Sequence, residues 1–253
     1  LDDPGVQSIL PNINKRIVTY GFSRQADIQA SNIRMQDLSA EYDVRYKDYN
    51  LGRIKMQITG RHNIQNSLLA VGIGLELDIP FEHIQNGLRE FNGVYRRFEL
   101  KGEVESITVY DDYAHHPTEV AAALSAARSV VGEGRIIAVH QPHLYSRTQA
   151  MAGEFAETYE RLADHTIVLD VFGAREDPVP GVTGALVSGR FADASNVDFL
   201  PDWQQASDRA AELARDGDII MTLSCGDVYR IVPQLLASLA STPERAGGVA
   251  TPA

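Results

Sequence analysis

The sequence predicts an α/β fold: a mostly parallel sheet with helices on both faces, preceded by a smaller part in which strands are followed by two helices. Three observations support this. The 253 residues are 44% hydrophobic and 23% charged, which is typical of a globular protein with a substantial core. Short β-favouring runs fill residues 15–58 and are followed by two segments of helical period. From residue 94 onward strands and helices alternate, and this favours a parallel sheet.

The first part, residues 1–93, is predicted to hold paired strands closed by two helices. Its strand runs are RIVTYGF, ADIQASNIRMQ, EYDVRYKD and RIKMQI, separated by polar or glycine-containing turns. Apolar residues at helical spacing from Ile64 to Leu75 predict a helix, and Pro80 begins a second one. Because Asn92-Gly93 breaks this pattern, we place a domain boundary between Gly93 and Val94.

The second part, residues 94–240, opens with FELKGEVESITVYDD, which is typical of a strand pair that turns around Lys101-Gly102. Further strands are expected at RIIAVH, HTIVLDVF, NVDFL and DIIMTLS. Helical spacing predicts helices over residues 117–131, 151–162, 183–191, 203–214 and 228–239. Residues 241–253 lack apolar periodicity and are expected to form a flexible tail.

Charge and cysteine content exclude several classes of protein. With 23 Lys and Arg against 34 Asp and Glu, the net charge is −11, which repels nucleic acids and anionic membrane surfaces. Cys225 is the single cysteine, so an internal disulfide framework is excluded and a reducing compartment is favoured. No apolar run approaches the ~18 residues of a membrane-spanning helix, and we expect a cytoplasmic protein. The chain opens on Leu1 within a helix-like segment, and we interpret it as a fragment.

Polar side chains follow four of the predicted strands of the second part. The segments are Asp111–Pro117, Gln141–Arg147, Arg175–Asp177 and Cys225–Asp227. Because the carboxyl ends of parallel strands meet at one edge of a sheet, these groups are expected to gather there. A guanidinium could hold the carboxylate of an amino acid while an imidazole or carboxylate receives protons from its amine. The alternative is that these loops are polar because they are exposed to water.

The acidic and histidine pairs each allow several interpretations. Asp111-Asp112 could cap the next helix, ligate a metal or accept hydrogen bonds from a ribose, and we favour the ribose. His115-His116 could act as a neutral proton acceptor or serve at the entry of the helix. Zinc is disfavoured because the pair lacks the further ligands that such a site needs. His140 lies inside a predicted strand and is interpreted as a packing residue.

The remaining candidates are also ambiguous. Arg147 could grip a carboxylate or be a solvated loop residue, and Arg96-Arg97 could reach phosphates near the domain boundary. Asn63 and Asn66 share a helix face and could read the edge of a base, or could be an N-cap and a solvent-facing residue. Cys225 could be a nucleophile with a lowered pKa, but a buried or loop thiol is the favoured alternative.

The nucleotide-binding loops best known from sequence are missing. No glycine is followed by lysine, so the chain has no GxxxxGK[ST] phosphate loop. Gly72-Ile73-Gly74 and Gly132-Glu133-Gly134 lack the third glycine of a dinucleotide fingerprint. This chain alone therefore has no usual loop for a triphosphate.

Four motifs in order, GRHNIQNSLLAV, GVYRRFE, VYDDYAHHPTEV and QPHLYSRT, resemble the Mur ligase family over about residues 1–239. The family has a UDP-sugar domain, a central ATPase domain and a C-terminal Rossmann-like domain that receives the amino acid. The resemblance implies that residues 1–93 are the end of the central domain and residues 94–240 the complete C-terminal domain. The phosphate loop and the Mg²⁺ ligands are then expected in the missing N-terminal portion.

The resemblance implies an ATP-dependent ligase of peptidoglycan synthesis, and hence of cell wall biogenesis, cell shape and cell division. It would join L-alanine to UDP-N-acetylmuramate through an acyl phosphate, with ATP and Mg²⁺, and the fragment would be inactive alone. Alternatives are a recycling ligase that attaches a tripeptide to the same sugar nucleotide, and a non-catalytic module that binds a nucleotide or amino acid.

The resemblance also implies roles for single residues. The expected ATP contacts are Asn63 and Asn66 at the adenine, Arg97 at the phosphates and Asp112 at the ribose, and the expected L-alanine contacts are Tyr113, His115, His143 and Arg147, with Arg147 at the carboxylate. The chain departs from the family at Leu144, where relatives often have Arg, and at SCGD, where a GAGD-like turn is common.

Overall fold

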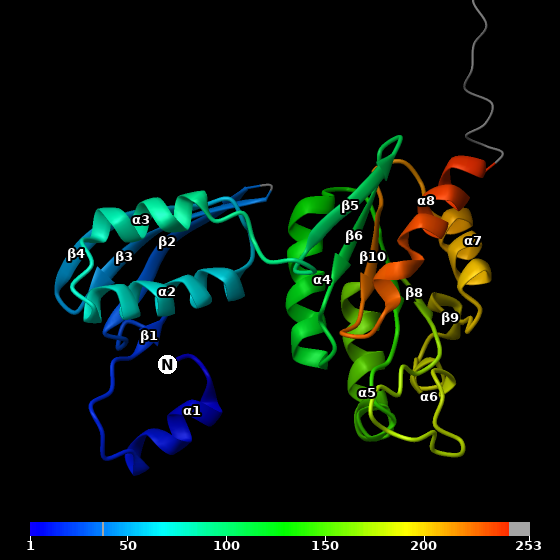
Figure 1. The fold of residues 1–253 in the computed structure, drawn as a ribbon, viewed down its shortest axis with the longest axis horizontal. Helices are drawn as coiled ribbons and strands as arrows, with labels where there is room; N and C mark the ends of the chain where they lie inside the picture. Colours follow the sequence, from blue (N-terminus) through cyan, green and yellow to red (C-terminus); the bar gives the residue numbers. More distant parts are fainter. Residues whose placement is uncertain (37, 243–253) are drawn as a thin grey trace, which may run out of the picture. The chain divides into compact units, whose positions relative to one another are not determined.

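The computed structural model describes residues 1–36 and 38–242, which form two compact units (Figure 1). The first unit runs from Leu1 to Gly93 and the second begins at Val94. Gly93 has a φ of +100°, which a residue with a side chain rarely adopts. The Asn92-Gly93 turn signal in the sequence therefore coincides with the point where the first unit ends. Each unit has its own hydrophobic core.

The first unit packs two helices on a small sheet. Its strands are ordered β1-β2-β3-β4, with β1 parallel to β2 and the other pairs antiparallel. Tyr42, Ile54 and Leu68 are fully buried between the sheet and the helices. The elements are α1 (Pro4–Ile9), η1 (Leu10–Asn12), β1 (Tyr20–Gly21), β2 (Ile28–Gln36), β3 (Ser39–Tyr46), β4 (Tyr49–Met56), α2 (Arg61–Glu76) and α3 (Phe81–Glu90).

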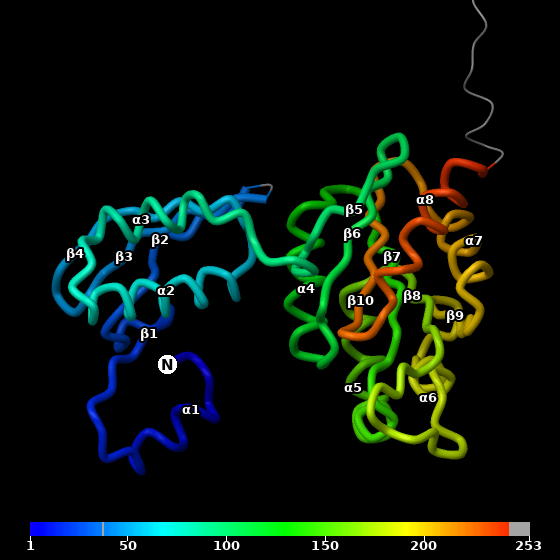
Figure 2. The backbone as a smooth tube through the Cα atoms, viewed as in Figure 1, coloured from blue at the N-terminus to red at the C-terminus, as the bar shows by residue number. Residues whose placement is uncertain are grey.

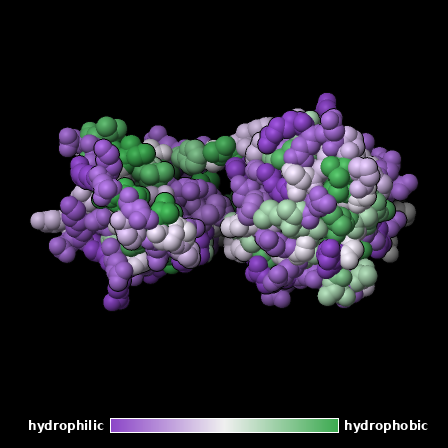
Figure 3. All heavy atoms as spheres, turned by 90° about the horizontal axis from the view of Figure 1, so that it is seen from below, coloured by the Kyte–Doolittle hydropathy of each residue, from purple (hydrophilic) through white to green (hydrophobic). Residues whose placement is uncertain are grey.

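The first predicted strand, RIVTYGF, is shorter than expected, because only Tyr20 and Gly21 pair with β2. Helix α2 also carries two exposed apolar residues, Leu69 and Ile73, opposite the buried residues Leu68 and Val71. The exposed Leu77 follows at the C-cap. Apolar residues on the surface of this unit are visible in green in Figure 3. Within residues 1–36 and 38–242, none of the helices has the length and apolar character that crossing a bilayer requires.

The second unit contains the predicted mostly parallel sheet, with strands ordered β5-β6-β10-β7-β8-β9. Only β5 runs antiparallel to its neighbour. The elements are β5 (Glu99–Val104), β6 (Ile107–Asp112), α4 (Pro117–Val131), β7 (Ile136–His140), α5 (Tyr145–Leu162), β8 (His165–Val168), α6 (Ala185–Ser188), η2 (Ala194–Asn196), β9 (Val197–Phe199), α7 (Trp203–Leu213), β10 (Ile219–Leu223), η3 (Val228–Ile231) and α8 (Val232–Ser241).

Helices cover both faces of this sheet, and the predicted fold class is confirmed. Leu124 of α4 and Phe155 of α5 are buried in the core on one face, whereas Ala210 of α7 and Leu235 of α8 are buried in the core on the other. The backbone tube in Figure 2 follows the chain from β9 through α7 back to β10, which enters the middle of the sheet.

The register of the central strands aligns their carboxyl ends. Leu223, the last residue of β10, pairs with Asp112 of β6 on one side and with His140 of β7 on the other. His140 in turn pairs with Val168 of β8. The loops that follow these four strands therefore leave the sheet at one edge, which is the placement that the sequence predicts for its polar segments.

The predicted turn at Lys101-Gly102 is wrong. Strands β5 and β6 pair out to Val104 and Ile107, so the turn lies at Glu105-Ser106, with Glu105 at a φ of +55°. Gly102 instead lies at a register shift, where an added Cβ would come within 2.9 Å of Leu236. The glycine is needed for close packing of α8 on the strand rather than for a turn.

Two helix predictions also need correction at their ends. Of the predicted helix over residues 183–191, only Ala185–Ser188 is α-helical, because Gly184 packs against the Leu169 carbonyl and Gly189 already ends the turn. The last helix begins as a 3₁₀ segment and continues as α8 through Ser241. Pro233 lies in the first turn of α8, a position that suits proline. Ser241 is thus helical rather than part of a tail, and residues 243–253 of the expected tail lie outside the described residues.

His140 is a packing residue, as predicted. Its fully buried ring lies 4.9 Å from Phe155 and 5.0 Å from Tyr159, measured between centroids. Among the described residues, neither of its ring nitrogens has a hydrogen-bond partner. Burial lowers the pKa of His140 to about 3, and this effect outweighs the Leu223 backbone, which favours the charged form. The folded protein therefore holds a neutral imidazole at neutral pH.

We expect His140→Phe to stabilise the second unit and to reduce its loss of stability in acid. The unfolded imidazole takes up a proton below its ordinary pKa of 6.5, whereas the folded ring stays neutral to about pH 3. The contribution of His140 to the stability of the wild type therefore falls as the pH drops below 6.5, by about 2 kcal/mol at pH 5. Phenylalanine removes this loss and also the ~1 kcal/mol cost of unpaired buried nitrogens.

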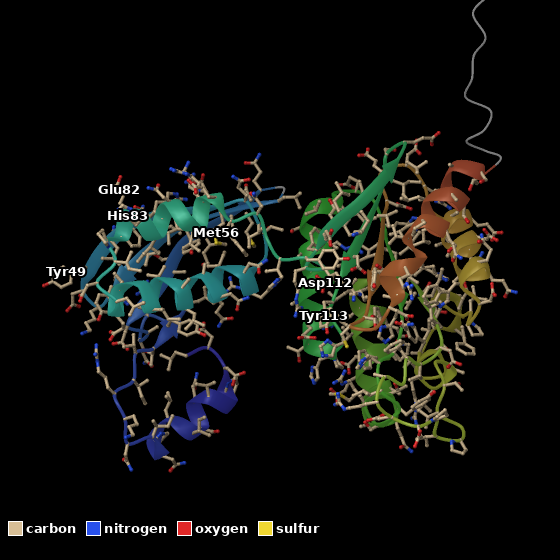
Figure 4. All side chains as sticks on the ribbon, viewed as in Figure 1. Tyr49, Met56, Glu82, His83, Asp112 and Tyr113 are labelled. Carbon is tan, nitrogen blue, oxygen red and sulfur yellow. The ribbon has the colours of Figure 1, made fainter. Side chains whose placement is uncertain are left out.

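Urea denaturation of wild type and variant at pH 7 and pH 5 measures the effect. The exposed His83 of α3, labelled in Figure 4, offers a matched control as His83→Phe. If the advantage of His140→Phe does not grow between pH 7 and pH 5, the buried ring is not held neutral as described.

Candidate functional site

Two neighbouring aspartates end β6 and serve different purposes. Asp111 is fully buried, and its Oδ2 lies 2.7 Å from Nε of Arg96. Asp112 is 5% exposed and accepts hydrogen bonds from the backbone N–H groups of Phe98 and Ala114, both at 2.8 Å. Burial raises the pKa of Asp112 to about 6, although these two donors and the charge of Arg97 favour its ionised form. Figure 4 shows Asp112 beside Tyr113 at the end of the strand.

Neither aspartate caps the following helix. His116 is the N-cap of α4, and its Nδ1 accepts a hydrogen bond from the Thr118 N–H at 3.3 Å. Of the histidine pair, His116 therefore has the helix-entry role, whereas Nδ1 of His115 lies 3.0 Å from the Tyr113 carbonyl and 3.2 Å from Glu119. Within residues 1–36 and 38–242, no three His, Cys, Asp or Glu side chains are grouped so that they could hold a metal ion.

The structure brings together the four residues that the sequence predicts at the amino-acid site. The rings of Tyr113 and His115 meet edge to face at 5.6 Å, and those of His115 and His143 at 6.1 Å. Arg147, in the first turn of α5, donates from Nη1 to the His115 carbonyl at 3.3 Å. Three aromatic rings and one guanidinium thus form a connected cluster at the strand ends.

His143 is a partly buried imidazole of this cluster. Its ring stacks on Phe172 at 5.8 Å, and its Nδ1 is buried without a hydrogen-bond partner in the part of the chain that the structure describes. Burial and the charges of Arg147, His115 and Arg175 lower the pKa of His143. The ring is therefore neutral at neutral pH and can accept a proton or a hydrogen bond.

Arg147 is partly exposed to solvent and partly in contact with other residues, so it is not a fully solvated loop residue. It is half-buried, and its positive charge acts on Cys225 as well as on His143. The pKa of Cys225 is nevertheless raised, because burial outweighs the nearby guanidinium. A thiol that is protonated at neutral pH favours the loop-thiol alternative over a nucleophile.

Arg96 and Arg97 are not equivalent. Arg96 is buried, with Nη1 and Nη2 donating to the carbonyls of Gly226 and Ser224, so of the Arg96-Arg97 pair Arg96 is not available to reach phosphates. Arg97 has a side chain that is 46% exposed, and its Nη1 lies 3.9 Å from Asp112. Arg97 remains free to contact an anion beside that carboxylate.

In the first unit, the two asparagines begin α2. Asn63 donates from Nδ2 to the Thr59 carbonyl at 2.7 Å, and Asn66 is exposed on the helix. Gly60, with a φ of +103°, is the N-cap residue, so neither asparagine has that role.

Gln141, which belongs to one of the predicted polar segments, and Leu144, where relatives often have Arg, shape the loop after β7. Gln141 is buried; its Nε2 donates to Asp227 at 2.9 Å and its Oε1 accepts from the Val228 N–H at 3.1 Å. Leu144 has a φ of +72°, and its N–H donates to the Phe172 carbonyl. A polar amide directly after a wholly buried strand is the signal available for Gln141, but a leucine gives none for positive φ.

Two family models match this chain. The model described as Mur ligase, glutamate ligase domain, matches residues 96–226, and the Mur ligase middle domain matches residues 1–74. A UDP-N-acetylmuramate–L-alanine ligase of Clavibacter sepedonicus is 59% identical over 252 residues, covering 100% of this chain and 52% of the relative. The ligase of the same name from Salinibacter ruber is 44% identical, covering 91% of this chain and 49% of that protein.

Among solved structures, the UDP-N-acetylmuramate-alanine ligase of Thermotoga maritima matches with a TM-score of 0.72 at 21% identity. It covers 88% of this chain and 48% of that structure, and supports the fold. The chain spans about half the length of the curated relatives it matches.

Proposed function

This chain belongs to the Mur ligase family, and we propose that it forms part of an ATP-dependent ligase that joins L-alanine to UDP-N-acetylmuramate in peptidoglycan synthesis. The observation that carries the proposal is the cluster of Tyr113, His115, His143 and Arg147 at one edge of the sheet. The 59% identity to a ligase of this name over the whole chain supports the choice of L-alanine among amino acids.

The cluster has complementary groups for both ends of a small amino acid. Arg147 offers a planar guanidinium that can hold a carboxylate with two hydrogen bonds. The neutral imidazole of His143 offers an acceptor for the amine, which must lose a proton before it can attack a carbonyl. The rings of Tyr113 and His115, which contact each other, would supply the apolar surface of the same site.

For ATP, we propose Asp112 at the ribose, Arg97 at the phosphates, and Asn63 and Asn66 at the adenine. The side chains present fit this use. Each oxygen of Asp112 accepts one backbone hydrogen bond and an ionised carboxylate can accept more, while Arg97 is half-exposed. ATP would supply the phosphoryl group that activates the sugar carboxylate as an acyl phosphate. We propose no Mg²⁺ ligand within residues 1–36 and 38–242, where no cluster of three metal-ligating side chains occurs.

A chimera tests the proposal. The half of the Clavibacter sepedonicus ligase that matches this chain is replaced by the chain itself, and phosphate release is measured with UDP-N-acetylmuramate, ATP and one acceptor. We expect release that depends on L-alanine, with little from the tripeptide of the recycling reaction. Preference for the tripeptide would assign the chain to the recycling ligase instead.

Calorimetry on the 253-residue chain alone separates the ligase from a binding module. A part of a ligase without a phosphate loop is expected to bind ATP weakly. Tight ATP binding by the isolated chain, together with an inactive chimera, would favour a non-catalytic nucleotide-binding module.

A further inference from the structure

The buried guanidinium of Arg96 joins three segments of the second unit. Its Nε contacts Asp111 at 2.7 Å, while Nη1 and Nη2 donate to the carbonyls of Gly226 at 2.9 Å and Ser224 at 2.7 Å. Arg96 is only 6% exposed, and a buried charge is retained only where its partners have good geometry. These contacts connect the segment before β5, the end of β6 and the loop after β10.

The same residue contacts Tyr113 with both its backbone and its side chain. The Arg96 carbonyl accepts a 2.7 Å hydrogen bond from the Tyr113 N–H, and the guanidinium carbon lies 5.2 Å from the centre of the Tyr113 ring. On its other side the guanidinium lies 4.4 Å from the ring of Tyr229. Arg96 has a φ of +57°, an unfavourable backbone conformation that persists when surrounding contacts impose it.

Asp111 extends these contacts into the central strands. Its second oxygen, Oδ1, accepts a 2.6 Å hydrogen bond from Thr222 of β10, so neither carboxylate oxygen is left without a donor. The side chain that pairs with Arg96 is therefore fixed by the neighbouring strand. Tyr113 lies two residues after Asp111, and the hydrogen bond from its N–H to the Arg96 carbonyl restrains its backbone.

We propose that Arg96 is a positioning residue, which holds Tyr113 in place for the amino acid through its contacts with Asp111 and the two loop carbonyls. The proposal rests on the proposed function, because it assigns a purpose to Tyr113 in binding L-alanine. The Arg96 guanidinium is buried and fully engaged within the chain, whereas the side chain of Arg97, which follows it, is 46% exposed.

Two variants of the chimera separate positioning from simple charge compensation. Arg96→Met leaves Asp111 buried without its partner, and we expect a melting temperature lower by about 10 °C. Adding Asp111→Asn removes that unpaired charge and still offers Thr222 an acceptor, so much of the stability is expected to return. The KM for L-alanine is expected to stay about tenfold above wild type in the double variant, with the KM for UDP-N-acetylmuramate unchanged.

If the double variant recovers both its stability and a wild-type KM for L-alanine, Arg96 only neutralises Asp111 and the proposal is overturned. A second measurement needs no ligase activity and uses the 253-residue chain. Hydrogen exchange of the Tyr113 amide is expected to be slow in the wild type and at least tenfold faster in the double variant, while the Val139 amide in β7 is unaffected. An equally protected Tyr113 amide would overturn the positioning role even if the chimera proved inactive.

Discussion

Replacing Arg147 by alanine in the chimera is expected to raise the KM for L-alanine by about 10- to 150-fold, with the KM for ATP nearly unchanged. The guanidinium lies beside His115 and its charge reaches His143, so it is placed to hold the carboxylate of the bound amino acid. A hydrogen bond to a charged group contributes about 1.5–3 kcal/mol, which corresponds to this range of affinities. Steady-state kinetics with each substrate varied in turn measures both constants.

Arg175→Ala is the matched control for this variant. Arg175 is exposed, follows β8 at the same edge of the sheet, and its charge also acts on His143. Removing it changes the net charge equally but takes away no proposed ligand contact, so the KM for L-alanine should change less than threefold, as is usual for an exposed charge. Equal increases in KM for ATP and L-alanine in Arg147→Ala would reassign Arg147 to general stability.

The fold class could be predicted because local patterns and burial agree in the second unit. The runs IIAVH and IIMTL are mostly apolar, as is typical of strands covered by helices on both sides, and both are wholly buried. The spacing of Val120, Leu124 and Ala127 likewise predicts the buried face of α4. The strand ends follow from these patterns, which is why the polar segments could be assigned to one edge.

The order of strands and the fate of individual charges could not be predicted in this way. That β10 lies between β6 and β7 depends on packing between segments about 80 to 110 residues apart. Arg96 is buried and Arg97 is not because the Arg96 guanidinium binds carbonyl groups of a loop about 130 residues later in the chain. Neighbouring identical residues give no local signal of which one is buried. The same limit applies to Gly102, whose role is decided by Leu236 of a distant helix.

The largest stability effect outside the site is expected for Asp218→Ala. Asp218 is 2% exposed at the start of β10 and accepts hydrogen bonds from the Arg135 N–H at 2.8 Å, the Arg135 Nη2 at 2.6 Å and the Arg215 N–H at 2.8 Å. Alanine leaves these donors without their acceptor at the point where β7 and β10 begin side by side. Because each hydrogen bond to a buried charge contributes about 1.5–3 kcal/mol and the three are coupled, we expect a loss of about 4 kcal/mol.

Urea denaturation of the 253-residue chain measures this loss as a lower midpoint with an unchanged slope. Asp216→Ala is the matched control, since Asp216 carries the same charge two residues earlier and is exposed. We expect it to change stability by less than about 0.5 kcal/mol, as exposed substitutions usually do. Asp218→Asn keeps one acceptor oxygen and should fall between the wild type and Asp218→Ala. If Asp218→Ala and Asp216→Ala have the same midpoint, water replaces the carboxylate without cost, and Asp218 does not hold the starts of the two strands together.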